Sequence, residues 1–115
     1  MNKINHVSGY GLLISKQKLQ DYYSCESEPD LNVHLYNLRE KYYISIAKVK
    51  LNQDIKYFIS IKKRFIKDFY CLIIYGIKYS PNTSMIYTQM KEISDKFKIP
   101  LQIKKYELSG IWLYK

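Results

Sequence analysis

The sequence predicts a single α+β domain over residues 1–115, with a mainly antiparallel sheet of about five strands and two or three helices. Two segments in the middle of the chain alternate apolar and polar residues with a period of two, which is typical of strands. A later segment carries apolar residues at helical spacing. At 115 residues, the chain is long enough to form one hydrophobic core without disulfide bonds.

The N-terminal elements are predicted to be a strand and a short helix. Residues 7–14, "VSGYGLLI", indicate a strand whose two glycines mark a bulge or a close approach of another backbone. Residues 15–23, "SKQKLQDYY", indicate a helix with Ser15 as its N-cap, because a serine hydroxyl can accept a hydrogen bond from a free backbone N–H.

An acidic connection over residues 24–30 separates this helix from a leucine-containing segment. In residues 31–38 the leucines recur at helical spacing, and Asp30 is available as a cap. The pattern leaves two interpretations open for this segment, a second short helix or an irregular turn.

The middle of the chain is predicted to form a β-hairpin. Residues 42–50 and 55–63 both alternate with a period of two. The "LNQD" segment at 51–54 lies between them, with Asn52 and Asp54 as turn-forming residues.

Three further elements complete the predicted order β-α-(α)-β-β-β-α-β. Residues 69–79, "FYCLIIYGIKY", are apolar on both faces and indicate a central, covered strand. Residues 80–98 indicate a helix, with Ser80 as the cap and Pro81 at the first helical position. Residues 101–115 alternate again and indicate a last strand, with a break possible at Ser109–Gly110. No internal repeat is visible in the sequence.

The net charge of +9 is distributed unevenly along the chain. Residues 1–40 contain four cations and five acids, a net charge of −1, whereas residues 41–115 contain fifteen cations and five acids, a net charge of +10. An AT-rich genome would enrich lysine and tyrosine throughout the chain, but it would not confine the positive excess to one part. The asymmetry therefore favours a polyanionic partner.

The segment "SIKKRFIKDF" (60–69) concentrates this charge between two predicted strands, so we expect it to form a hairpin end. Cations at a sheet edge can follow a phosphate backbone. The expected nucleic-acid-binding residues are those of this segment together with two lysines of the last strand: Lys62, Lys63, Arg64, Lys67, Lys104 and Lys105. The alternative interpretation is a solvated turn, with lysines that protect edge strands from aggregation.

Three aromatic residues, Tyr10, Tyr22 and Trp112, are candidates for a protein-binding surface, because exposed tyrosine and tryptophan often anchor interfaces. For Trp112, packing against the apolar stripe of the 80–98 helix is the favoured alternative. Tyrosines on strands could also stack on bases, although packing into the core explains most of them.

The sequence lacks the common signatures of catalysis and of cofactor binding. Its two histidines and two cysteines have no metal-ligand spacing, so no metal and no cofactor are expected. Cys71 lies in an apolar run and is expected to be buried, and a disulfide with Cys25 is left open. The absence of a signal region and of an apolar run of membrane-spanning length indicates a cytoplasmic protein without a membrane partner.

These observations predict a small, basic, non-enzymatic protein. We expect it to bind RNA or another nucleic acid, for example as an accessory protein on a ribosome or ribonucleoprotein, through phosphate contacts without much base readout. The alternative is a virus- or mobile-element-encoded inhibitor that binds a host protein.

Overall fold

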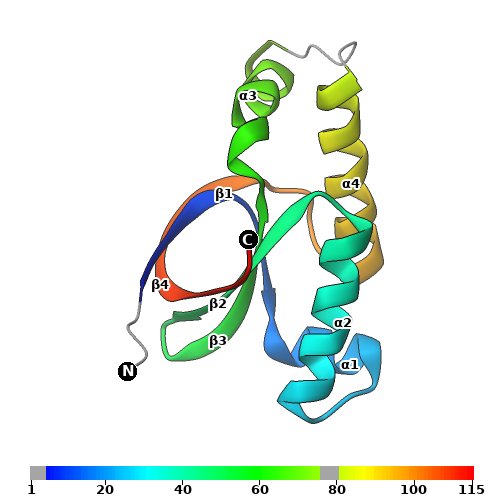
Figure 1. Cartoon of the computed structure of the whole chain (residues 1–115), viewed down its shortest axis with the longest axis vertical. Coiled ribbons are helices and arrows are strands. Elements are labelled where there is room, and N and C mark those ends of the chain that lie inside the picture. The colour runs from blue at the N-terminus through cyan, green and yellow to red at the C-terminus, as the bar shows by residue number, and fades with distance from the viewer. Residues whose placement is uncertain (1–4, 76–80) are drawn as a thin grey trace.

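The computed structural model describes residues 5–75 and 81–115, and its strands form a closed antiparallel barrel with the order β1-β3-β2-β4. The α+β class is therefore confirmed, but the described residues contain four strands instead of about five (Figure 1). The strands are β1 (Asn5–Ser15), β2 (Ile44–Leu51), β3 (Asp54–Ile61) and β4 (Lys104–Tyr114). The helices are α1 (Lys16–Tyr23), α2 (Glu28–Lys41), α3 (Ile66–Tyr75) and α4 (Pro81–Phe97), with a short 3-10 helix η1 (Lys63–Phe65) before α3.

The order of elements repeats once along the chain. The first half runs from β1 through α1 and α2 to β2, and the second half runs from β3 through η1, α3 and α4 to β4. The exchange of the two halves replaces β1 by β3 and β2 by β4. It converts the β2–β3 pairing into the β4–β1 pairing, and the β1–β3 and β2–β4 pairings stay the same. The described fold thus has an approximate two-fold symmetry in its topology that the sequence does not display.

The first half largely follows the prediction. The Ser15 hydroxyl accepts a hydrogen bond from the Lys18 N–H and caps α1, as expected. The leucine-containing segment is a helix, and it begins before residue 31. Its cap is Ser27, whose hydroxyl accepts from the Asp30 N–H, so the assignment of Asp30 as the cap is wrong.

The β2–β3 hairpin is confirmed. Its turn consists of Asn52 and Gln53, both in the left-handed region with φ of 51° and 69°. A tight turn with two such residues matches the twist of the paired strands. Asp54, expected to be a turn former, belongs to β3 and pairs with Leu51.

The predicted strand at 69–79 is wrong, because residues 66–75 form helix α3. The preceding basic segment is therefore not a hairpin end. Lys62 precedes η1, and the chain continues directly into α3. A short run that is apolar on all sides fits a buried strand and a packed helix equally well. The rest of this predicted strand, residues 76–79, and the predicted cap Ser80 lie outside the described residues.

The last two predicted elements are confirmed. Helix α4 begins at Pro81, and β4 continues without a break through Gly110. Gly110 is buried against β2, and a Cβ atom there would overlap the carbonyl oxygen of Lys48. Glycine therefore allows the two strands to approach closely at this position, where the sequence had suggested a break.

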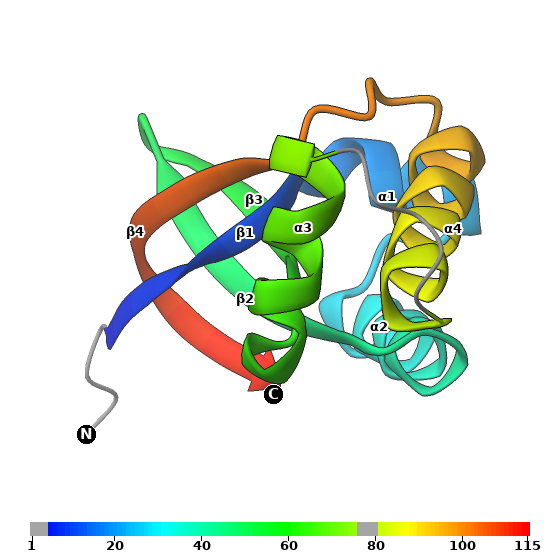
Figure 2. The same ribbon diagram turned by 90° about the horizontal axis from the view of Figure 1, so that it is seen from above.

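The apolar core has two parts, which lie on opposite faces of the barrel wall. The larger part packs β1, β2 and β3 against the helices and includes Leu12, Ile46 and Ile59 together with Leu35 of α2 and Met90 of α4. The smaller part fills the barrel, and its buried members are Val7, Ala47, Val49 and Phe58. Figure 2 shows the barrel on one side and the helical layer on the other. Because β2 and β3 contribute to both parts, their middle residues are buried on both faces.

Candidate nucleic-acid interface

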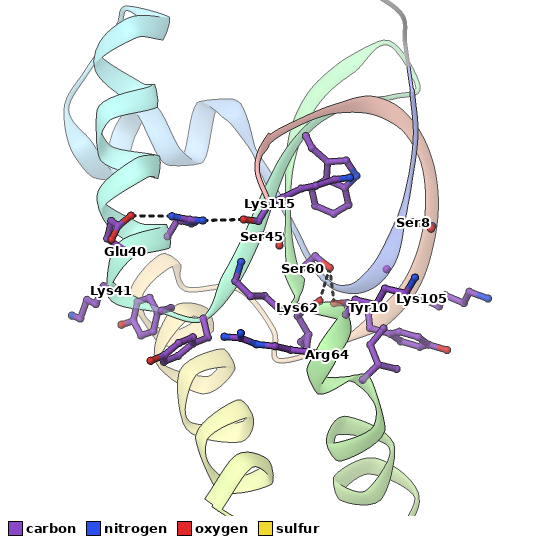
Figure 3. Close-up of a pocket in the computed structure, with 18 residues that line it drawn as sticks. Ser8, Tyr10, Glu40, Lys41, Ser45, Ser60, Lys62, Arg64, Lys105 and Lys115 are labelled. Atoms are coloured by element: carbon purple, nitrogen blue, oxygen red, sulfur yellow. Dashed lines mark hydrogen bonds and ion pairs between the residues drawn. The ribbon is translucent and has the colours of Figure 1, made fainter.

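A cleft of about 1050 Å³ opens at one mouth of the barrel. Residues of all four strands line it, together with the C-terminal end of α2 and with η1. In Figure 3, Lys62 and Arg64 lie between Glu40 and Lys41 on one side and Tyr10 and Lys105 on the other. Barrel mouths are common positions for ligand sites, because the strand ends surround a concave surface.

The part of the cleft nearest the barrel interior is lined by small and hydroxyl-bearing residues and one large ring. Ser45 and Ser60 face each other across the β2–β3 pair, and both are buried. Gly9 keeps this region open, because a Cβ atom there would lie 2.6 Å from the Ser60 Oγ. Trp112 packs against Phe58 inside the barrel, with ring centroids 6.2 Å apart. The favoured packing of Trp112 on the α4 stripe is therefore wrong.

The outer part of the cleft is strongly basic. Among the described residues that line it are seven with cationic side chains and one with an acidic side chain, Glu40. The cations come from four separate stretches of the sequence: Arg39 and Lys41; Lys62, Lys63 and Arg64; Lys105; and Lys115. Arg39 and Arg64 are the two arginines of the whole sequence. An AT-rich genome, which enriches lysine, does not explain why both arginines line one cleft.

Lys62 lies close enough to Arg39 and Arg64 to feel the charge of both. Burial lowers the pKa of its amine below the usual 10.5, and the neighbouring Arg39 and Arg64 lower it further. The ion pairs of the described residues are Arg39–Glu40, Lys48–Glu28 and Lys91–Asp95, so Lys62 has no carboxylate partner there. An anion bound at this position would relieve the repulsion among the three cations.

The two arginines are held in place by other groups. The Arg39 guanidinium donates to Glu40 Oε1 at 2.9 Å and to the backbone carbonyl of Lys115 at 3.0 Å. The Arg64 guanidinium lies 4.8 Å from the ring centroid of Phe65 and 5.7 Å from that of Tyr43. Stacked guanidinium groups keep their planar edge free for hydrogen bonds to a phosphate.

Tyr43, which lines the cleft, is positioned from α4. The buried side chain of Gln89 donates to the Tyr43 carbonyl at 3.1 Å and accepts from the Tyr43 N–H at 2.9 Å. This pair of bonds fixes the backbone between α2 and β2. The exposed Tyr43 ring then lies beside Arg64 and Phe65.

Four of the six predicted phosphate-binding residues meet in the cleft, namely Lys62, Lys63, Arg64 and Lys105. The other two, Lys67 and Lys104, are exposed and do not line it. Lys104 and Lys105 are consecutive residues of β4, and neighbouring side chains of a strand point to opposite faces. Because the two lysines are adjacent in the sequence, the sequence alone could not show that only Lys105 lines the cleft.

The predicted aromatic surface is divided by the fold. Tyr10 and Trp112 line the cleft, and the Tyr10 hydroxyl is hydrogen-bonded to that of Tyr70. Tyr22 lies elsewhere, stacked edge-on against Phe97 with the Lys96 amine 5.9 Å from its ring centroid. The three residues therefore do not form one continuous surface.

Sequence reasoning missed Arg39, Lys41 and Lys115. Arg39 and Lys41 lie in the last turn of α2, where cations also stabilise the negative end of the helix dipole. The signal that could have found Arg39 is its residue type, because Arg64 is its only counterpart in a lysine-rich chain.

The lysines of β4 lie in the part of the strand that is paired on one side. Residues 104–110 pair with β1, whereas the pairing with β2 involves residues 109–114. The edge-protection interpretation therefore still applies to Lys104 and Lys105. Of the two, Lys105 also lines the cleft.

The described residues contain no group of three or more histidines, cysteines or acids arranged to hold a metal ion. His34 is stacked on Tyr23 with ring centroids 4.3 Å apart, and Cys25 is buried and unpaired. Because Cys25 is a free cysteine, the structure has no Cys25–Cys71 disulfide, the bond that the sequence left open. The side chain of Cys71 itself lies outside the described residues. No helix in the described ranges has the length and apolar character needed to cross a membrane.

Comparisons of this chain with protein-family models, curated proteins and solved structures gave no match. The fold and the site define the class of this molecule as a small α+β barrel protein with a basic cleft at the barrel mouth. Its function must accordingly be argued from the chemistry of that cleft.

Proposed function

We propose that the protein binds nucleic acid, with RNA as the expected form, through phosphate contacts made in the cleft at the barrel mouth. The observation that carries this proposal is the convergence of seven cationic side chains, including both arginines, around a single acidic side chain, that of Glu40. That carboxylate is already paired with Arg39. The other cations are available to neutralise phosphates.

The concave shape of the site favours single-stranded over double-stranded nucleic acid. Single strands are typically bound in basic grooves that also carry aromatic rings for base stacking. Here, Tyr43 and Trp112 line the same cleft as the cations. Base stacking of this kind tolerates every base, so the proposal predicts little sequence preference. No catalytic step is part of the proposal.

The test is fluorescence anisotropy with a labelled single-stranded RNA over a series of salt concentrations. If about three phosphates are contacted, the slope of log K against log salt should be about −2. The triple variant Lys62→Glu, Lys63→Glu and Arg64→Glu should lose binding. The matched triple variant Lys50→Glu, Lys67→Glu and Lys104→Glu makes the same change in net charge at exposed positions outside the cleft and should retain most of it.

Two results would contradict the proposal. If both triple variants lose affinity equally, binding follows net charge and not the cleft. If the wild-type protein shows no salt-dependent affinity for RNA, the nucleic-acid proposal fails. The host-protein partner expected from the sequence would then be the next hypothesis to test, by recovery of a partner that persists after nuclease treatment.

A further inference from the structure

Three cations from different elements surround the centre of the cleft. Lys62 follows β3, Arg39 lies in the last turn of α2, and Arg64 belongs to η1. All three line the cleft, and the two arginines are close enough to Lys62 to disfavour its charge. Figure 3 shows the Lys62 side chain reaching toward the part of the cleft that holds Ser45 and Ser60.

Each member of this group retains capacity for a ligand. Arg39 has a buried Nε atom without a hydrogen-bond partner in the described part of the chain, although its two terminal nitrogens are engaged. Arg64 makes ring contacts but no hydrogen bond to a protein acceptor among the described residues, and Lys62 likewise has no ion pair there. The buried residue Ser45 also lines the cleft.

A phosphate monoester fits such a group better than the phosphodiester of a nucleic-acid backbone. At neutral pH, a monoester carries a charge of about −1.5 to −2 and three terminal oxygens that accept hydrogen bonds. An internal diester carries a single charge and has two such oxygens. Three crowded cations gain more from the more highly charged ligand, because it offsets more of their mutual repulsion.

The room around the three cations suits the end of a strand. The cleft volume of about 1050 Å³ lies just above the usual range for small-ligand pockets, about 300 to 1,000 Å³. A terminal phosphate at Lys62 would leave space for the adjoining nucleotides. The remaining cations of the outer cleft, such as Lys63 and Lys105, would then lie along the path of the strand.

We propose that Lys62, Arg39 and Arg64 form a subsite for a phosphate monoester, so that the protein prefers a nucleic-acid strand with a phosphorylated end over one with a hydroxyl end. This inference rests on the proposed function, since it assigns a role to one part of the same cleft. It goes further by naming the chemical group that the centre of the cleft recognises.

The experiment compares RNA oligonucleotides of about ten nucleotides, a length within the range bound by single-strand-binding domains. One carries a 5′-phosphate, one a 3′-phosphate, and one has hydroxyl groups at both ends. All carry an internal fluorescent label, so that both ends are free. The phosphorylated oligonucleotide that binds more tightly than the hydroxyl strand identifies which end supplies the monoester. We expect the preferred phosphorylated strand to bind about tenfold more tightly than the hydroxyl strand, the effect of one charge-assisted contact.

The variant Lys62→Gln should abolish this preference, so that phosphorylated and hydroxyl strands bind alike. The matched variant Lys67→Gln removes a lysine from the exposed surface of α3 outside the cleft and should keep the preference. Circular dichroism checks that both variants are folded. If Lys62→Gln weakens all strands by the same factor and leaves the preference intact, the subsite has been assigned to the wrong residues.

Failure of the subsite and failure of the proposed function give different results. Equal, salt-dependent binding of all three wild-type strands would overturn the subsite and leave the proposed function standing. If no RNA binds, inorganic phosphate is titrated while the fluorescence of Trp112, the single tryptophan of the sequence, is recorded. A saturating change that Lys62→Gln removes would support the subsite alone, and no change would overturn both.

Discussion

The side chain of Gln89 pairs with the backbone of Tyr43 through two hydrogen bonds, one to the N–H at 2.9 Å and one to the carbonyl at 3.1 Å. The contact joins helix α4 to the segment between α2 and β2, residues that are far apart in the sequence. Gln89 is only 4% exposed, and both hydrogen bonds are partly buried. Tyr43 in turn contributes its ring to the cleft beside Arg64.

Replacing Gln89 by leucine should destabilise the protein and remove the hydrogen bonds that position Tyr43 at the cleft. The Tyr43 N–H and carbonyl would lose their partners, which we expect to lower the free energy of unfolding by about 2 kcal/mol. Urea denaturation measures this loss. The control is Gln17→Leu, because the exposed Gln17 side chain bonds only to the neighbouring Asp21 carboxylate at 2.8 Å. Equal losses in the two variants would show that the Gln89 contact has no special role.

Lys62→Gln should make the protein more stable at neutral pH even though it weakens phosphate binding. Burial and then Arg39 and Arg64 lower the pKa of Lys62 in the folded protein below the usual 10.5. The folded protein therefore holds fewer protons than the unfolded chain between these two values, and wild-type stability rises with pH across that interval. Below it, the charged amine destabilises the fold, by about 0.5 kcal/mol if it resembles other like-charge contacts.

This gain in stability from Lys62→Gln should disappear as the pH rises through the lowered pKa toward 10.5, because the wild-type amine then also becomes neutral. Thermal denaturation of both proteins over a pH series tests the sign. Lys67→Gln is the control and should change stability little at any pH. A wild-type protein more stable than Lys62→Gln at neutral pH, without added phosphate, would contradict the like-charge interpretation.

The Glu28–Lys48 ion pair joins the start of α2 to β2 and should give the protein an acid-sensitive contribution. The hydrogen bond from Lys48 lowers the pKa of Glu28 below its usual 4.5. Its contribution is therefore present above 4.5 and is lost as the pH falls through the lowered value. Because the Glu28 side chain is 39% exposed, Glu28→Gln should cost less than about 1 kcal/mol at neutral pH.

The stability difference between wild type and Glu28→Gln should vanish at acid pH, where the wild-type carboxyl is protonated. Denaturant titrations from neutral pH down past 4.5 measure it. Glu26→Gln is a suitable control, because Glu26 is exposed and its carboxylate has no ion pair among the described residues. A difference that stays constant with pH would exclude the ion pair as its cause.

Gly11→Ala should be among the most damaging single substitutions in the barrel. A Cβ atom at Gly11 would overlap the backbone carbonyl of Ile59 on β3, and backbone cannot move aside without disturbing the β1–β3 pairing. We expect a loss of about 3 kcal/mol or more, or failure to fold. At Gly9 the nearest atom is the Ser60 side-chain oxygen, which can rotate. Gly9→Ala should therefore cost clearly less, and equal losses would contradict this explanation.

The sequence predicted local elements well because their signals are local. The Ser15 cap, the β2–β3 hairpin and helix α4 each depend on residues within one stretch. The Ser27 cap also had a local signal, a serine followed three residues later by Asp30. The prediction relied on the leucine spacing instead and therefore placed the start of the helix too late. Helix α3 was mistaken for a strand because the prediction began at Phe69. From Ile66 to Tyr75 the apolar residues do follow the period of a helix.

Barrel closure could not be predicted because it depends on pairings between distant strands, such as β1 with β4. The same is true of the cleft. Lys62, Lys63 and Arg64 were found because they are neighbours in the sequence, whereas Arg39 and Lys115 reach them only through the fold. A charge cluster in space becomes visible in the sequence only where its members happen to be adjacent.

The closing strand of the barrel is synthesised after the other described elements. Residues 104–114 pair with both β1 and β2, so the barrel cannot close while these residues are still inside the ribosomal tunnel. A nascent chain that has reached the end of α4 therefore presents β1 and β2 with open edges, each able to pair with another chain. Emergence of residues 104–114 from the ribosomal tunnel, and not the emergence of the first half, is the event that closes the barrel, and a truncated product lacking β4 should aggregate or be degraded.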